Sequence, residues 1–249
     1  MEITEELRRE QTLQWLMGRP IQHLLPEQRR YLQLYRQEYH AVGAATGPLD
    51  TAAAIEAISA LYRLVHGRVP DQIIWKDSPR QGTLSELSIG GASLSSAMKD
   101  RLGRALQPLS DGVSSDVWRE VERELSDPLR DAVDAFTTHI WAQLADLRNQ
   151  RSRMPMYGSI RVETLARARY HLDILNTPLD AKLVEEFRLH DLISRLVGWW
   201  WPHREICICT ARPELIEWTE DEPPRIRRVR YRDGWVVSDG PRVGRVPPI

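Results

Sequence analysis

The residues best suited to chemistry stand together in one short segment, Trp75-Lys76-Asp77-Ser78-Pro79. This segment closes a β-branched run at residues 72–75, which predicts a strand. A carboxylate, a hydroxyl and an indole at the end of a strand could bind a small polar ligand, or Asp77 and Ser78 could act as acid and nucleophile. A structural role is simpler, because Ser78 or Asp77 can cap a helix that starts at Pro79. A cap can also line a site, so both roles stay open.

A second candidate, His203, follows three consecutive tryptophans and a proline. It could reach the pocket of Asp77 and form an acid–base pair with it, while Arg212 binds an anion. This chemistry requires Asp77 and His203 to converge within hydrogen-bond distance, directly or through one water. The structural alternative, which we favour, is that the imidazole satisfies a buried indole or carbonyl group.

Several possible metal ligands lie in predicted helices: His139, His171, Asp173, His190 and Asp191. Neighbouring side chains on a helix point about 100° apart, so the adjacent His190 and Asp191 do not form a site by themselves. The two cysteines of the chain are too few for a closed zinc site. We predict no metal site, and the sequence identifies no cofactor.

An arginine-rich strand is predicted at residues 225–232. Alternation places Arg228, Arg230 and Arg232 on one face, with Val229 and Tyr231 on the other. Such a row, next to Trp235, could grip phosphates or stack on bases. The acidic residues just upstream, at 214–222, favour a different role, since cross-strand charge pairs would neutralise the arginines.

The composition is that of an ordinary soluble globular protein, with 42% hydrophobic residues, 28% charged residues and a net charge of -1. Binding to nucleic acid or to an anionic membrane would therefore need a local patch. The chain begins without the pattern of a signal peptide, and no apolar run reaches the length of a membrane span. Cys207 and Cys209 stand one residue apart, which disfavours a structural disulfide and fits a reducing compartment. We expect a cytoplasmic protein without membrane association, and the dominance of arginine over lysine favours a GC-rich bacterial source.

Apolar spacing, capping residues and prolines predict a mostly helical body followed by short strands. The predicted helices cover residues 3–17, 26–42, 51–66, 93–106, 114–126, 128–147, 160–176 and 180–197, with a loop or short helix at 80–92. The predicted strands cover residues 72–75, 205–210, 215–219 and 225–232, and Asp233-Gly234 predicts a hairpin turn. The expected fold class is α+β. We expect a single domain over 1–249, with a helical body to about residue 198 and a β-rich part from about residue 199.

The run Trp199-Trp200-Trp201 stands between these two parts. Successive side chains diverge on a helix and on a strand, so the three indoles cannot share one face. We predict that the run packs where the helical body meets the β-rich part.

Trp75-Lys76-Asp77-Ser78-Pro79 resembles the W-x-D-S-P signature of an uncharacterised bacterial family, one of the domains of unknown function. The resemblance spans about residues 26–248 and includes three further motifs: Trp199-Trp200-Trp201-Pro202, Arg212-Pro213 with Asp233-Gly234-Trp235, and Gly244-Arg245-Val246-Pro247. Two family features are altered, because Tyr157-Gly158-Ser159-Ile160 keeps only the glycine of the central motif and residues 221–225 replace a His and Gly-Pro-Ala segment. The resemblance implies where a site lies and does not name a reaction.

Together these residues predict a binding or interaction protein with a tryptophan-lined polar groove. The groove residues would be Trp75, Asp77, Ser78, Trp200 and His203, with Arg212 as a further ligand-binding residue. The partner would be a small molecule or another protein. One alternative is a hydrolase or transferase that uses Asp77 and His203, and another is nucleic-acid binding through the arginine strand.

Overall fold

The computed structural model describes residues 9–11, 13–14, 17, 20–21, 24–89, 94, 97–98, 101, 104, 113–124, 128–146, 156–157, 162–175, 177 and 179–238. Its helices are α2 (Pro26–Gly43), α3 (Thr51–His66), α4 (Pro79–Ser88), α6 (Ser115–Glu124), α7 (Pro128–Asp146), α8 (Val162–Asp173) and α9 (Ala181–Leu196). Its strands are β1 (Gln72–Lys76), β2 (Met156–Tyr157), β3 (Trp199–Pro202), β4 (Ile206–Thr210), β5 (Leu215–Trp218), β6 (Ile226–Arg230) and β7 (Val236–Ser238). The α+β class is confirmed. The helices predicted at 3–17 and 93–106 lie largely outside the described residues, as does the whole Gly244-Arg245-Val246-Pro247 motif.

The helix ends follow from the capping residues in the sequence. Asp50 accepts a hydrogen bond from the Ala53 N–H at 3.0 Å, and Gly67 closes α3 with a left-handed φ of 73°. Ser78 caps α4 by accepting from the Gln81 N–H at 3.2 Å, with Pro79 as first helical residue. The structural prediction for Ser78 is thereby confirmed.

The main sheet has four strands in the order β1-β4-β3-β2. β1 and β4 run parallel, in register from Gln72 opposite Ile206 to Lys76 opposite Thr210. β3 runs antiparallel to β4, and the short β2 adds an edge. The sheet therefore joins a strand of the helical body to strands of the C-terminal part, so the two parts are not separate in space.

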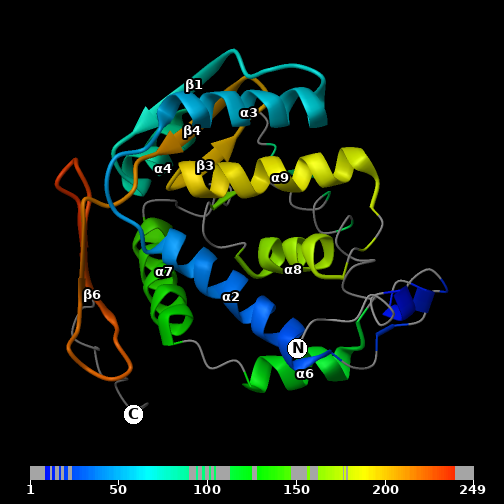
Figure 1. The fold of residues 1–249 in the computed structure, drawn as a ribbon. Helices are drawn as coiled ribbons and strands as arrows, with labels where there is room; N and C mark the ends of the chain where they lie inside the picture. Colours follow the sequence, from blue (N-terminus) through cyan, green and yellow to red (C-terminus); the bar gives the residue numbers. More distant parts are fainter. Residues whose placement is uncertain are drawn as a thin grey trace, which may run out of the picture.

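The tryptophan run forms β3, and its alternation divides the core into two layers. Trp200 packs with Cys207 and Cys209 beneath α3 and α9, which lie along one face of the sheet in Figure 1. Trp199 and Trp201 point to the other face, where they meet apolar residues of α7 and of the C-terminal strands. All three indoles are buried. This confirms the prediction that they diverge and pack between the helical and β-rich parts.

The second sheet has the order β5-β6-β7 and is antiparallel throughout. Figure 1 shows its long hairpin, labelled β6, at one side of the helical layers. Gly234 makes the turn with a φ of 81°, as the Asp233-Gly234 pair predicts. Ile226, Val229, Tyr231 and Val237 bury the inner face against the core.

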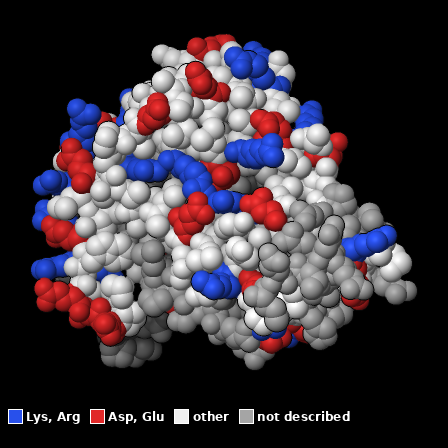
Figure 2. Space-filling model, viewed as in Figure 1, with Lys and Arg blue, Asp and Glu red and all other residues white. Residues whose placement is uncertain are grey.

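A network of ion pairs ties α2, α8 and α9 together. Glu38 of α2 accepts from Arg169 of α8 at 2.9 Å and from Arg195 of α9 at 2.7 Å. The two arginines also bind Asp173 and Asp191 within their own helices. Figure 2 shows that basic and acidic side chains alternate across this face of the molecule. The charges therefore cancel locally and create no field of one sign.

Within the described ranges, none of the helices is both long enough and apolar enough to cross a bilayer.

Candidate functional site

The parallel strands β1 and β4 end side by side, at Lys76 and Thr210. The Ala211 N–H donates to the Lys76 carbonyl at 2.8 Å, which holds the two outgoing segments together. Asp77 leaves from one strand and Arg212 from the other. In open sheets, ligands bind outside the carboxyl ends of parallel strands, so this edge is where a site is expected.

A pocket of about 720 Å³ lies at this edge. Trp75, Lys76 and Asp77 line it from the end of β1, and residues 211–214 line it from the end of β4. Further walls come from residues 47–49 and Thr51, before and at the start of α3, and from Arg230 and Arg232 of the hairpin. The structure thus brings three predicted ligand-binding residues, Trp75, Asp77 and Arg212, into one pocket.

Basic side chains outnumber acidic ones in this pocket. Among the described residues, Lys76, Arg212, Arg230 and Arg232 line it together with two carboxylates, Asp77 and Glu214. One of these carboxylates already has a partner, because Glu214 forms a half-exposed ion pair with Arg230 at 3.8 Å. The pocket is therefore net positive within a chain whose overall charge is close to zero.

Arg212 is less exposed than Arg230 and Arg232. Its Nη2 donates to the Arg195 carbonyl in the last turn of α9. Burial lowers the pKa of its guanidinium. Among the described residues no carboxylate pairs with it. Since a guanidinium carries five N–H donors, one bond to a carbonyl leaves others for the pocket.

A hydrogen bond connects the hairpin to the start of α4. The Ser78 hydroxyl, which is fully buried, donates to Asp233 Oδ2 at 2.5 Å, and Asp233 Oδ1 accepts from the Trp235 N–H at 3.0 Å. Two of the motifs in the family resemblance, Asp77-Ser78-Pro79 and Asp233-Gly234-Trp235, therefore meet in space. This contact fixes the turn that follows Arg230 and Arg232.

His203 does not belong to this pocket, and the acid–base pair with Asp77 is corrected. Pro202 lies opposite Cys207, and the His203 N–H donates to the Ile206 carbonyl, so His203 sits where β4 begins. Asp77 sits where β4 ends. Four residue steps separate these positions, roughly 13 Å along the strand. His203 is also buried, and its carbonyl accepts from the Tyr62 hydroxyl at 2.8 Å.

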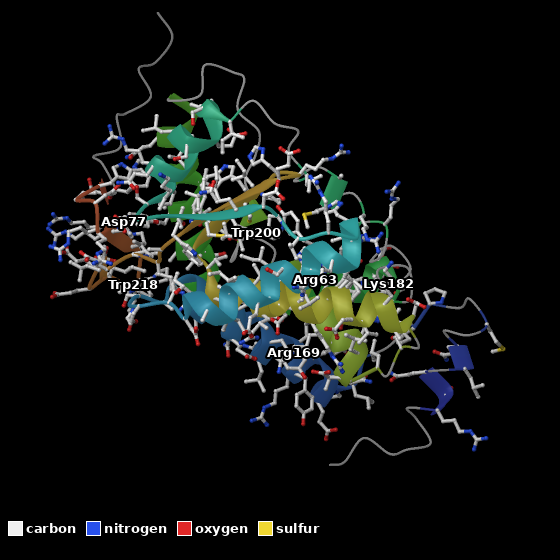
Figure 3. The ribbon with its side chains drawn as sticks, turned by 90° about the horizontal axis from the view of Figure 1, so that it is seen from above. Arg63, Asp77, Arg169, Lys182, Trp200 and Trp218 are labelled. Carbon is white, nitrogen blue, oxygen red and sulfur yellow. The ribbon has the colours of Figure 1, made fainter. Side chains whose placement is uncertain are left out.

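Trp200 does not line the groove either. It is only 2% exposed, and its ring lies 6.3 Å from that of His190 under α9. Figure 3 shows Asp77 near the second sheet, with Trp200 further inside the molecule. Of the predicted groove residues, Trp75, Asp77 and Arg212 line the pocket. Ser78 is not among the lining residues and instead donates a hydrogen bond to Asp233 of the hairpin turn.

The arginine strand has the predicted alternation. Val229 and Tyr231 are buried, and Arg230 and Arg232 are exposed. Arg228 lies 3.8 Å from Glu217 on the neighbouring strand, and Arg230 lies 3.8 Å from Glu214. These cross-strand pairs are the neutralisation that the sequence favoured.

Trp235 departs from the predicted arrangement of the arginine row. It stacks on Tyr231, with ring centroids 5.3 Å apart and an interplanar angle of 23°. It therefore packs toward the inner side of the hairpin, where it is partly buried against the core.

In the part of the chain that the structure describes, no three possible ligands gather to hold a metal ion. His171 is buried and bonds to the Thr177 hydroxyl at 3.1 Å. Cys207 and Cys209 are free and buried, with sulfurs 3.8 Å apart, and burial raises the pKa of the Cys209 thiol. A buried thiol held in its neutral form is a poor nucleophile.

Sequence reasoning missed some of the pocket and assigned some of it to another role. Lys76, Glu214 and residues 47–49 were not predicted to line a binding pocket. Arg230 and Arg232 were predicted only as possible nucleic-acid contacts. The signal that could have found Glu214 is its place just after β4, where a parallel partner of β1 would end. The contribution of residues 47–49 depends on the Gly47 N–H, which donates to the Pro213 carbonyl at 3.3 Å, and has no signature in the sequence.

Comparisons of this chain with protein-family models, with curated proteins and with solved structures find no match.

Proposed function

We propose that this chain is a binding protein that holds a small anionic ligand in the pocket at the carboxyl ends of β1 and β4. Arg212 carries the proposal, because its guanidinium is half-buried on the pocket wall without a carboxylate partner in the described residues. Partial removal of a cation from water costs free energy, and a bound anion would offset that cost.

The surroundings of Arg212 support a ligand that is enclosed from several sides. The walls come from two strand ends, the segment before α3 and the β6–β7 hairpin, so a molecule in the pocket would contact parts of the chain far apart in sequence. A volume of about 720 Å³ lies within the range of pockets that bind small organic molecules. A small-molecule ligand is therefore better supported than a protein partner.

The other two candidate functions have less support. A hydrolase or transferase built on Asp77 and His203 would need the two side chains to meet, and they lie at opposite ends of β4. Nucleic-acid binding through Arg228, Arg230 and Arg232 would have to compete with the cross-strand ion pairs of Arg228 and Arg230. Two free buried cysteines remain in keeping with our proposal of a cytoplasmic protein.

Isothermal titration calorimetry with inorganic phosphate and with benzoate tests this function. We expect at least one of these anions to bind the wild type at low salt, and we expect Arg212→Gln to weaken that binding at least tenfold. Because Arg212 also bonds to α9, Arg232→Gln provides a second variant at an exposed pocket position. Arg227→Gln is the matched control, since Arg227 is exposed on the same hairpin but does not line the pocket. Anion binding that is equal in all four proteins would overturn the proposal.

A further inference from the structure

We infer that the ligand of this pocket is a phosphate monoester that carries a flat ring, with the phosphate held by arginines and the ring lying against Trp75. This inference rests on the proposed function and deepens it, because it names the chemical class of the anion and of its organic part.

The charge of the pocket favours a doubly charged group over a singly charged one. Among the described lining residues, four cationic side chains face two carboxylates, which leaves an excess of about two positive charges. A phosphate monoester carries about -1.5 to -2 charges at neutral pH, whereas a carboxylate carries one. A phosphate therefore matches the excess and a carboxylate leaves part of it unmatched.

The types of the cationic side chains also favour a phosphate over a carboxylate. Three of the four are arginines, at positions 212, 230 and 232. The planar guanidinium binds phosphate oxygens through two parallel N–H bonds, which gives directionality that a lysine lacks. Arg232 is exposed and has no ion pair among the described residues, so its donors are available at the mouth of the pocket.

Trp75 determines what the rest of the ligand can be. Its side chain is half-buried against the cluster under α3 and α9, and its indole nitrogen is fully buried without a hydrogen bond. The accessible part of Trp75 is therefore the carbon framework of the ring, which offers apolar contact and no donor. Aromatic surfaces of this kind prefer offset stacking with another ring.

The neighbours of Trp75 extend this apolar surface. Pro48, Leu49 and Pro213 line the same pocket as Trp75, while the arginines occupy the β4 and hairpin sides. The described lining thus offers both apolar and cationic side chains, which suits a ligand that carries a phosphate and a ring. Nucleoside monophosphates and the 5′-phosphorylated end of a nucleic acid both have this chemistry.

Titration calorimetry with four probes tests the inference: phenyl phosphate, benzoate, inorganic phosphate and phenol. We expect phenyl phosphate to bind at least tenfold more tightly than each of the other three. We also expect Trp75→Leu to remove most of the advantage of phenyl phosphate over inorganic phosphate, while Trp75→Phe retains it. The Phe variant keeps a ring, so it separates loss of stacking from damage to the core.

The outcomes separate this inference from the proposed function. If benzoate binds as tightly as phenyl phosphate and still depends on Arg212 and Arg232, the pocket binds anions but the phosphate assignment is wrong. If inorganic phosphate equals phenyl phosphate, the ring assignment is wrong. If no probe binds in a manner that depends on these arginines, both proposals fail.

The source of the phosphate monoester is distinguished by two further ligands. A nucleoside 5′-monophosphate and a 5′-phosphorylated tetranucleotide are titrated against the same variants, with the unphosphorylated tetranucleotide as control. Tighter binding of the mononucleotide indicates a free metabolite, and tighter binding of the phosphorylated tetranucleotide indicates a nucleic-acid end. Failure of both to bind would overturn the nucleotide form of the inference.

Discussion

At the scale of single residues, Gly82 is where the backbone of α4 packs directly on Trp201 and Thr210 of the sheet. A Cβ at this position would lie 2.5 Å from Cζ3 and 2.6 Å from Cη2 of Trp201, which is buried. Close packing leaves the indole little room to yield. We expect Gly82→Ala to lower the free energy of unfolding by about 1–3 kcal/mol from overpacking. The gain in helix propensity, roughly 1 kcal/mol, opposes this loss only in part.

Urea unfolding followed by circular dichroism measures the effect of Gly82→Ala. Ser85→Ala, one turn further along α4 at a half-exposed position, is the control and should change stability little. A Gly82→Ala protein as stable as the wild type would show that α4 does not pack on Trp201 as described.

A second prediction at this scale concerns His171 and the pH dependence of the unfolding free energy. Burial lowers its pKa to about 4, and the charge of Arg167 adds to this shift. The unfolded chain has a histidine pKa near 6.5, so between about pH 6.5 and pH 4 the unfolded state binds a proton that the folded state does not. The folded state therefore loses about 1.4 kcal/mol per pH unit as the pH falls through this window.

We expect His171→Gln to flatten the fall in unfolding free energy between pH 6.5 and pH 4.5, relative to the wild type. Urea titrations at four pH values in this window give the two slopes. Parallel slopes would mean that His171 is accessible to protons in the folded state.

At the scale of elements, the bond between Ser78 and Asp233 connects the β6–β7 turn to α4. Without it, Arg232 and Arg230 would be less firmly held at the pocket. We expect Asp233→Ala to weaken phenyl phosphate binding several-fold in calorimetry. Asp221→Ala is the control, because Asp221 pairs with Arg225 in the exposed loop between β5 and β6, away from the pocket lining. Equal affinities in Asp233→Ala and Asp221→Ala would indicate that the turn does not position the arginines.

The ion pairs of Glu38 make another prediction about elements. Burial acts to raise the pKa of Glu38, but hydrogen bonds and charges from Arg195 and Arg169 outweigh it and lower this pKa. Because Glu38 joins α2 to both α8 and α9, we expect Glu38→Gln to lower the free energy of unfolding by about 1 kcal/mol.

Thermal or urea unfolding at two salt concentrations checks this expectation. The loss should shrink at high salt, where the network of the wild type is screened. Glu120→Gln, which removes a pair with Arg29 alone, should cost less. A larger loss from Glu120→Gln than from Glu38→Gln would contradict the account.

Most elements could be predicted because their ends are encoded locally. Asp50, Gly67, Pro79 and Gly234 act within one turn of their own position, so capping rules place them without knowledge of the fold. The buried and exposed faces of β6 were predicted in the same way, from the alternation of apolar and charged residues along the strand. The stacking of Trp235 on Tyr231 was missed, because it depends on how the chain folds back after the turn.

At the scale of the whole molecule, the pocket depends on one pairing that is remote in sequence. β1 and β4 are separated by five of the described helices, and their parallel register brings Asp77 beside Arg212. No local pattern specifies this pairing. His203 was predicted to lie at the end of the sheet where Asp77 lies, and this was wrong for the same reason. His203 lies at the opposite end, because β3 and β4 are antiparallel and the chain reverses between them.

Our proposal places a tetrahedral dianion between Arg212 and Arg232, which both line the pocket. A crystal of the protein soaked with tungstate tests this most directly, because the tungsten position follows from anomalous scattering. We predict a strong peak in the pocket at the carboxyl ends of β1 and β4, which disappears in Arg212→Gln crystals soaked under the same conditions. A peak only on the outer face of the hairpin, beside Arg228, or no peak in the pocket, would contradict the account.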